Sequence, residues 1–375
     1  MCQTQRMMFQ FECKNSSNIE KTKSIIQCKK KGIFMQQSRK ILIIFIFTIL
    51  MYFHISTPKA IAGPKPMVIK LAMLPPSGSP WHEILLDMAE QWKTISNGKI
   101  IIRLYPGGIA GTETDMIRKM RIGQLHAAAL SSNGLKDIAE EVSSLVIPFN
   151  CTSWNEFNDL KKELAPKLEA KLANDGFIVL NWGIAGWVRF FVPNPESSID
   201  AVRKSKMFVW AGDDPTIEIW KSVGFNVVPL SPTDMLPALQ TGMINAYPTT
   251  ALMSLASQWF AFTPYMIDMP WAPLVGAVII SKKTWDKIPD SLKPALKNIS
   301  EKTGERLEKE IIKLEDEAVS EMQKRGLQVI VPDEQQLKEW ESAIKSIYPV
   351  LRGSIIPEEW FDEAVSITNR ERKND

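Results

Sequence analysis

The sequence predicts an α/β protein built of two α/β units and one long helix. Three observations predict it. From residue 68 onward, short apolar runs alternate with amphipathic helical patterns, which favours a parallel sheet with helices on both faces. The alternation restarts as a new unit near Gly186. A single apolar stripe, with Lys and Glu between its members, then continues from residue 294 to residue 325.

Residues 1–62 differ from the rest and predict a secretory signal peptide. Lys29–Lys31 and Arg39–Lys40 precede the apolar run 41–50, and Ala60-Ile61-Ala62 offers small residues for cleavage. The alternative is a single membrane anchor, but the run is about half of the ~20 residues needed to span a bilayer. We expect cleavage near Ala62, translation from Met35, and a periplasmic mature chain with no stable membrane insertion.

Charge and cysteine content after residue 62 exclude several classes of protein. The leader holds 10 of the 45 Lys and Arg and 2 of the 42 Asp and Glu, which leaves a net charge of −5. A mildly acidic chain lacks the basic surface that nucleic-acid binding needs. Cys2, Cys13 and Cys28 fall in the leader, so Cys151 is left without a partner for an internal disulfide.

The first lobe opens with a strand at 68–74 and a helix at 81–95, which Ser96-Asn97-Gly98 ends. A strand at 99–105, a helix at 112–121 and a strand at 126–130 follow. The next strand is expected at 177–180. The pattern therefore predicts a βαβ arrangement in this lobe.

The second lobe begins with a strand at 188–192. Strands at 207–210 and 226–229 alternate with helices at about 215–223 and 233–241, and a strand at 275–280 fits either sheet. Residues 294–325 form one helix of ~48 Å, either a plain surface helix or a spine across both lobes. Gly326, a strand at 327–331 and helices from residue 335 follow. We expect lobe I to comprise 63–185 and 273–312, lobe II to comprise 186–272 and 313–350, and 351–375 to be a C-terminal segment.

The residues that catalysis needs are sparse. After residue 62 the only imidazoles are His82 and His126, which we interpret as structural, and no Gly-x-Ser-x-Gly elbow occurs. His, Cys, Asp and Glu do not gather at metal-ligand spacings. The glycines of 107–111 lack a phosphate-loop register and are interpreted as a turn before a helix. We expect neither enzymatic activity nor a metal or cofactor.

Tryptophan is abundant, with 12 in the chain. Each one alone is typical of a protein core, but several lie near expected edges between the lobes and together indicate an apolar cleft. These are Trp81, Trp182, Trp187, Trp210, Trp259 and Trp271.

The stretch 186–250 resembles the central part of the DctP-type substrate-binding proteins of tripartite ATP-independent periplasmic (TRAP) transporters. The resemblance rests on Lys206-Met207-Phe208-Val209-Trp210, Val227-Val228-Pro229-Leu230 and Ala238-Leu239-Gln240-Thr241-Gly242, and extends over about 63–355. It implies a two-lobed periplasmic binding protein fold of type II-like form with a long helix spanning both lobes. It also implies closure around a small molecule by hinge bending, and delivery to a small and a large membrane subunit with a sodium gradient.

The same resemblance shows where this chain departs from the family. The family's arginine, which clamps a substrate carboxylate, aligns with Phe208, and the proline two residues on aligns with Trp210. A second arginine aligns with Val188 and a ligand-contacting asparagine with Thr249. Arg189 is adjacent, but strand alternation sends it to the opposite face.

These departures predict a receptor for a small, relatively apolar or monocarboxylate-like ligand. A buried carboxylate without an arginine would cost several kcal/mol, whereas aromatic surface favours apolar groups. Alternatives are a carboxylate receptor with Arg189 as a repositioned clamp, a lipid carrier, or a receptor for an ATP-driven importer. The expected ligand-binding residues are Phe208, Trp210, Tyr247, Thr249, Trp81, Val188 and Trp271.

Overall fold

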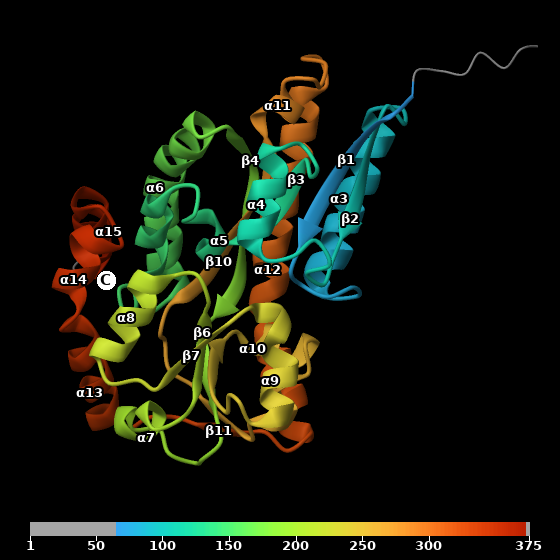
Figure 1. Cartoon of the computed structure of the whole chain (residues 1–375). Helices are drawn as coiled ribbons and strands as arrows, with labels where there is room; N and C mark the ends of the chain where they lie inside the picture. The colour runs from blue at the N-terminus through green and yellow to red at the C-terminus, as the bar shows by residue number, and fades with distance from the viewer. Residues whose placement is uncertain (1–64, 373–375) are drawn as a thin grey trace, which may run out of the picture. The chain divides into compact units, whose positions relative to one another are not determined.

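The computed structural model describes residues 65–372 (Figure 1). The predicted leader, its start at Met35 and its cleavage site near Ala62 lie outside the described residues. Within 65–372 the strands form a five-stranded sheet, a four-stranded sheet and a two-stranded sheet. We call the elements around the first sheet lobe I and those around the other two lobe II.

Lobe I contains the first four strands and a strand that returns late in the chain. Its first helix starts one residue before the predicted 81, because Ser79 caps it by accepting from His82 N and Pro80 is its first residue. The elements are β1 (Met67–Met73), α3 (Pro80–Ile95), β2 (Ile100–Tyr105), α4 (Glu113–Arg121), β3 (Ala127–Ser131), α5 (Ser132–Leu135), the 3₁₀ helix η1 (Glu140–Val146), α6 (Trp154–Asn174), β4 (Phe177–Trp187), β10 (Pro273–Ser281) and α11 (Lys282–Trp285).

Lobe II is built from shorter elements. Its two-stranded sheet is joined to the four-stranded one through a bridge between Met207 and Ala246. The elements are β5 (Arg189–Val192), α7 (Ile199–Arg203), β6 (Met207–Trp210), α8 (Asp214–Ser222), β7 (Val227–Leu230), the 3₁₀ helix η2 (Pro232–Asp234), α9 (Met235–Thr241), β8 (Tyr247–Thr249), α10 (Ala251–Ala256), the 3₁₀ helix η3 (Trp259–Phe262), β9 (Tyr265–Ile267), β11 (Gln328–Ile330) and α13 (Glu334–Lys345).

The sheet of lobe I is mixed, so the prediction of a parallel sheet is only partly right. Its order is β2-β1-β3-β10-β4, and β1 pairs in parallel with β2 and β3. β10 runs antiparallel to both β3 and β4. The apolar runs of the sequence identify these strands but carry no information on their direction, and β10 enters lobe I from the opposite end.

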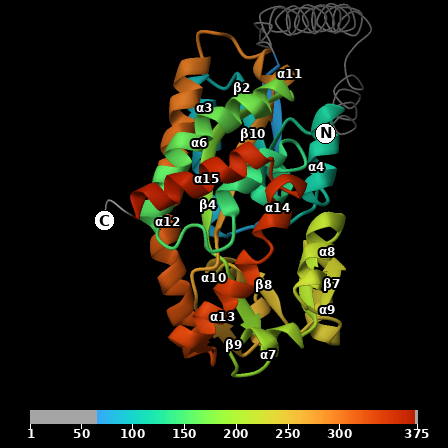
Figure 2. The ribbon, with the colours of Figure 1, turned by 90° about the vertical axis from the view of Figure 1, so that its left-hand side faces the viewer.

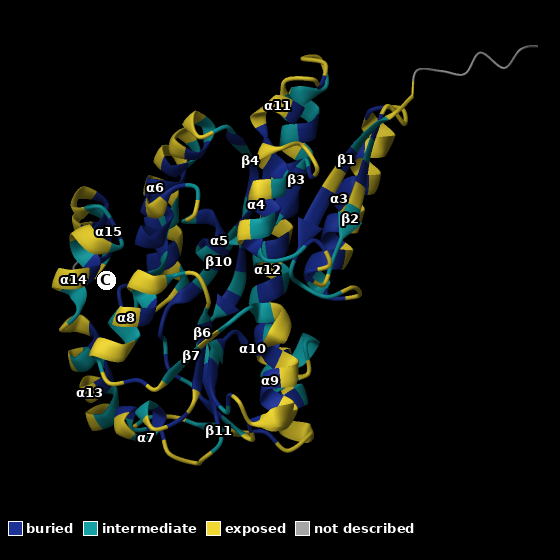
Figure 3. Cartoon of the chain, in the orientation of Figure 1, coloured by how far each residue is buried: buried dark blue, intermediate teal, exposed yellow. Residues whose placement is uncertain are grey.

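The long helix α12 (Lys293–Lys324) confirms the expected element at 294–325. It packs against α3 and β4 of lobe I and against α10 of lobe II, so it acts as a spine rather than as a plain surface helix (Figure 2). Gly304 allows the close approach to β4, because a Cβ there would lie 2.6 Å from the Trp182 carbonyl oxygen. The buried face of the spine is continuous with the cores of both lobes (Figure 3).

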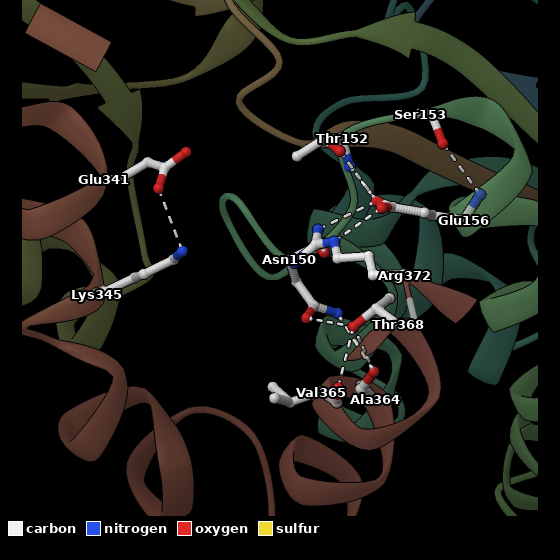
Figure 4. A network of polar contacts seen from close by, with 10 residues as sticks. All are labelled: Asn150, Thr152, Ser153, Glu156, Glu341, Lys345, Ala364, Val365, Thr368 and Arg372. Carbon is white, nitrogen blue, oxygen red and sulfur yellow. Dashed lines mark hydrogen bonds and ion pairs between the residues drawn. The ribbon is translucent and has the colours of Figure 1, made fainter. Parts of the chain in front are cut away.

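The last described helices pack on lobe I. After α13, α14 (Tyr348–Ser354) and α15 (Glu358–Glu371) lead back to α6. Figure 4 shows the contacts that fix α15: Thr368 Oγ1 donates to Asn150 Oδ1 at 2.8 Å, and Arg372 pairs with Glu156 at 2.8 Å. These contacts hold the C-terminal helix against lobe I. The lobe boundaries at 185/186, 272/273 and 312/313 stay predictions.

Candidate functional site

A cavity of about 830 Å³ lies between the two lobes. Lobe I contributes residues of α3, the 107–108 turn, the end of β3, and β4 and β10. Lobe II contributes residues of β6, α8, α9, β8 and η3. The two lobes also touch beside the cavity, because a Cβ on Gly108 would lie 2.9 Å from Thr233 Cγ2. Because both lobes form its wall, the shape of this cavity depends on their relative position.

Phe208 and Trp210 lie side by side in the wall, as strand alternation predicts. Both belong to β6, and their ring centroids are 6.2 Å apart. Phe208 is only 3% exposed, and its backbone N–H donates to the Ala246 carbonyl at 2.9 Å. The backbone is therefore held in place, and the two rings give this part of the wall an aromatic surface.

Four more of the predicted residues also line the cavity: Trp81, Val188, Thr249 and Trp271. Val188 N donates to the Ala272 carbonyl at 2.9 Å. Val188 lies between β4 and β5 and Ala272 just before β10, so two segments that connect the lobes are hydrogen-bonded to each other here. The ring of Trp271 stacks on Trp220 with centroids 5.5 Å apart. Six of the seven predicted residues are thus brought to one cavity; that they contact the ligand remains a prediction.

Tyr247 is the exception, because the structure places it in the core and not in the cavity wall. Its side chain is fully buried, and its ring stacks on Phe191 with centroids 5.0 Å apart. Its hydroxyl bonds with the hydroxyls of Ser254 at 2.8 Å and Thr263 at 3.1 Å. The hydroxyl has its partners inside lobe II, which is why the ring turns away from the cavity.

Arg189 is engaged elsewhere. Its Nε donates to Asp268 Oδ1 at 2.7 Å and its Nη1 to Glu315 Oε2 at 3.1 Å. Glu315, on the spine, also accepts from Leu252 N at 2.8 Å. Burial raises the pKa of Glu315 to about 7, against the opposing effect of these donors. Arg189 does not line the cavity, so in this structure its guanidinium offers no clamp there.

The glycine beside this network leaves room for the carboxylate. Gly186 has a φ of +121°, and a Cβ on it would lie 2.3 Å from Glu315 Cδ. The carboxylate of the spine therefore occupies the space that any other residue at 186 would fill with its side chain. Gly186 and Glu315 thus fit together where the chain passes from one lobe to the other.

The electrostatics of the wall are one-sided. Among residues 65–372, its charged side chains are Glu113 and Asp213, and it contains no Lys, Arg or His. Glu113 accepts from Ser131 N at 2.6 Å and Ser131 Oγ at 2.7 Å, and burial raises its pKa to about 7. Asp213 forms an ion pair with Lys136, which links lobe II to lobe I. The wall therefore offers an anion no cation of its own.

Sequence reasoning missed Glu113, Asn181 and Trp220 as wall residues. Trp220 lies on α8. Its position in the apolar pattern of that helix does not distinguish a residue of the cavity wall from a core residue. Two tryptophans of the predicted set lie outside the wall. Trp182 Nε1 donates to Glu169 at 2.9 Å, and the Trp187 ring packs on Trp154 with centroids 5.0 Å apart.

The residues that we interpreted as structural have structural partners. His82 Nδ1 accepts from Gly78 N at 3.2 Å, and His126 Nδ1 accepts from Lys70 N at 3.0 Å. The 107–111 turn leads into α4, whose N-cap is Thr112 in a reciprocal pair with Asp115. Within 65–372, no three His, Cys, Asp or Glu gather closely enough to hold a metal ion.

Comparison with known families identifies the class of protein. The family model described as bacterial extracellular solute-binding protein, family 7 (DctP) matches residues 71–352. The chain belongs to this family. As a member of this family it is a solute-binding protein and not an enzyme, and its fold is that of the two-lobed TRAP periplasmic solute-binding proteins.

Relatives of this receptor are distant in sequence and similar in fold. The sialic acid-binding periplasmic protein SiaP of Vibrio cholerae is 22% identical over 298 residues, which cover 76% of this chain and 89% of SiaP. A TRAP solute-binding protein of Haemophilus influenzae with bound L-gulonate superposes with a TM-score of 0.74 at 21% identity, covering 81% of this chain and 99% of that one. One from Sulfurospirillum deleyianum with bound succinate has a TM-score of 0.75 at 18% identity, covering 81% and 100%.

The part of the receptor that the structure describes has no helix with both the length and the apolar character needed to cross a bilayer.

Proposed function

We propose that this receptor binds a small, largely apolar and uncharged ligand in the cavity between its lobes. It then delivers that ligand to the small and large membrane subunits of a TRAP transporter. One observation carries the proposal: among the described residues, the cavity wall has aromatic, aliphatic and neutral polar side chains and two acids but no cationic group.

A carboxylate in this cavity would be poorly supported. Removing an anion from water into an apolar site costs several kcal/mol unless a partner compensates for the lost hydration. Here Arg189, the nearest candidate in the sequence, already donates to two carboxylates. The two acids of the wall, Glu113 and Asp213, supply no positive charge that could take its place. This argues against the alternative in which Arg189 serves as a repositioned clamp.

An apolar ligand gains from the same wall. Burying apolar surface contributes ~25 cal/mol per Å² before ordering costs are subtracted. Phe208 and Trp210 lie on one face of β6, Trp81 comes from α3 of lobe I, and Trp271 lies in the segment just before β10. A ligand between them would contact both lobes, which supports closure of the lobes by hinge bending.

Gulonate and succinate, which the Haemophilus influenzae and Sulfurospirillum deleyianum structures hold, are carboxylate anions. We therefore propose that this receptor binds a different class of ligand from those two proteins but has the same role in transport. It also includes export to the periplasm, with the leader removed near Ala62.

Calorimetry with matched compounds tests the ligand class. 2-Methoxynaphthalene and 2-naphthol carry the same rings as 2-naphthoate, and only the last is an anion. The purified receptor should bind the two neutral compounds and not the carboxylate. Tighter binding of 2-naphthoate than of both neutral compounds would refute the proposal. Mass spectrometry of material extracted from the receptor purified from periplasm would then identify the natural ligand.

A further inference from the structure

One polar side chain in the cavity wall has an atom with no hydrogen-bond partner. Asn181 lies in β4 and is 4% exposed. Its Oδ1 is buried and finds no donor among the described residues. Its Nδ2 contacts the sulfur of Met88 at 3.9 Å, which is a weak acceptor. The carbonyl of this amide is therefore a hydrogen-bond acceptor that the fold itself does not use.

The fold holds this side chain in place. On one side the spine approaches closely, because a Cβ on Gly304 would lie 2.9 Å from Asn181 Cβ. In the sheet, Asn181 is paired with Val278 of β10. The cavity wall also contains Gly183 of the same strand, Leu85 of α3 and Leu307 of α12. Because packing surrounds it, the amide cannot swing out to bulk water to satisfy its oxygen.

A buried acceptor without a donor lowers the stability of a protein, since the atom has lost its hydrogen bonds to water. In a binding cavity the same atom gains a partner when a ligand brings a donor. Such a contact also discriminates between ligands, because a compound of the same shape without the donor leaves the acceptor unpaired. Asn181 has the burial, the place in the wall and the unused acceptor that this role requires.

We propose that Asn181 is the polar anchor of the cavity and accepts a hydrogen bond from a neutral O–H or N–H group of the ligand. The inference rests on the proposed function and narrows it. The favoured ligands are apolar molecules with a hydroxyl or N–H donor, and hydrocarbons and ethers of the same shape bind less well. Asn181 thereby determines specificity within the apolar class.

Calorimetry on three proteins tests this anchor: wild type, Asn181→Leu, and Asn298→Leu as the control. Asn298 is exposed on α12 and is not a residue of the cavity wall. Wild type and the control should bind 2-naphthol about tenfold more tightly than 2-methoxynaphthalene, the effect of one neutral hydrogen bond. Asn181→Leu should lose this preference. Indole against 1-methylindole repeats the comparison for an N–H donor.

Thermal unfolding of the ligand-free proteins gives a second readout. Asn181→Leu removes an unpaired polar atom and nearly keeps the volume, so its Tm should equal that of wild type or exceed it by about 2 °C. A clear fall in Tm would show that the amide has a structural partner and would overturn the anchor. So would a tenfold preference for 2-naphthol that survives in Asn181→Leu.

The outcomes separate this inference from the proposed function. Equal affinity of wild type for each alcohol or N–H compound and its methylated partner refutes the anchor alone, because an apolar site without a polar contact would behave in that way. Failure of all four compounds to bind wild type contradicts the proposed function and the anchor with it. The affinities of wild type for the paired compounds test the anchor without any variant. The test therefore still holds if Asn181→Leu does not fold.

Discussion

Replacing Gly186 with alanine should destabilise the receptor strongly, because the new methyl group would displace the carboxylate of Glu315. The backbone at Gly186 has a φ of +121°, which costs an alanine about 1–2 kcal/mol. The added Cβ would also lie 2.3 Å from Glu315 Cδ and 2.6 Å from both carboxylate oxygens. The clash is relieved only if the carboxylate of Glu315 moves.

Moving the Glu315 carboxylate breaks hydrogen bonds whose contribution to stability can be estimated. Glu315 accepts from Leu252 N at 2.8 Å, from Ala251 N at 3.3 Å and from Arg189 at 3.1 Å. Hydrogen bonds to charged groups contribute ~1.5–3 kcal/mol each. Loss of two, with the backbone cost, lowers the free energy of unfolding by about 4–8 kcal/mol.

Urea unfolding followed by circular dichroism measures this free energy. Gly212→Ala is the matched control, since Gly212 also has a positive φ, +88°, but a Cβ there meets nothing within 4 Å. The control should cost only about 1–2 kcal/mol. Equal destabilisation by the two substitutions would refute the clash. In a Glu315→Ala background the extra cost of Gly186→Ala should disappear.

Further predictions concern the cavity and the leader. Phe208→Ala should weaken 2-methoxynaphthalene binding by ~1–3 kcal/mol through lost burial, and Phe208→Arg should abolish it; tight binding by folded Phe208→Arg would exclude the contact. The wild-type free energy of unfolding should fall as pH rises from about 4.5 to about 7, because the unfolded chain releases the Glu113 proton first. Glu113→Gln should reduce this fall by about 3 kcal/mol, and an unchanged urea-unfolding pH profile would contradict it. Solution scattering should show compaction with 2-methoxynaphthalene; a constant radius of gyration at saturation argues against closure. Intact-mass measurement of periplasmic extract should give a chain that starts at Gly63, and a membrane-retained form with residues 35–62 would contradict cleavage.

Periodicity found the elements whose patterns are uninterrupted. Helix α12 and strand β6 lie within a residue of the predicted bounds. Strand β4 was expected at 177–180 but extends to Trp187. Asn181, Gly183 and Gly186 interrupt its apolar pattern, and pairing with β10 through two register shifts continues it. Long-range pairing of this kind overrides local preference.

In the candidate site, too, local rules placed some residues correctly and missed those whose position depends on distant partners. Strand alternation placed Phe208 and Trp210 on one face correctly, because that rule is local. It could not show that the Tyr247 hydroxyl would find Ser254 and Thr263 inside the lobe. Asn181 was missed because a single polar residue in a strand has the same sequence pattern whether its amide is paired or not.

The position of β10 in the sheet of lobe I has a consequence for the order in which the receptor folds. β10 lies between β3 and β4, and β4 pairs with no other strand of that sheet. A chain that is synthesised only as far as residue 272 therefore lacks the strand that joins β4 to the others, although it already contains every strand of lobe II except β11. Contacts between residues so far apart in sequence form slowly. Lobe I thus completes its sheet only after residues 273–281 have been synthesised, and until then β4 has no strand partner in that sheet.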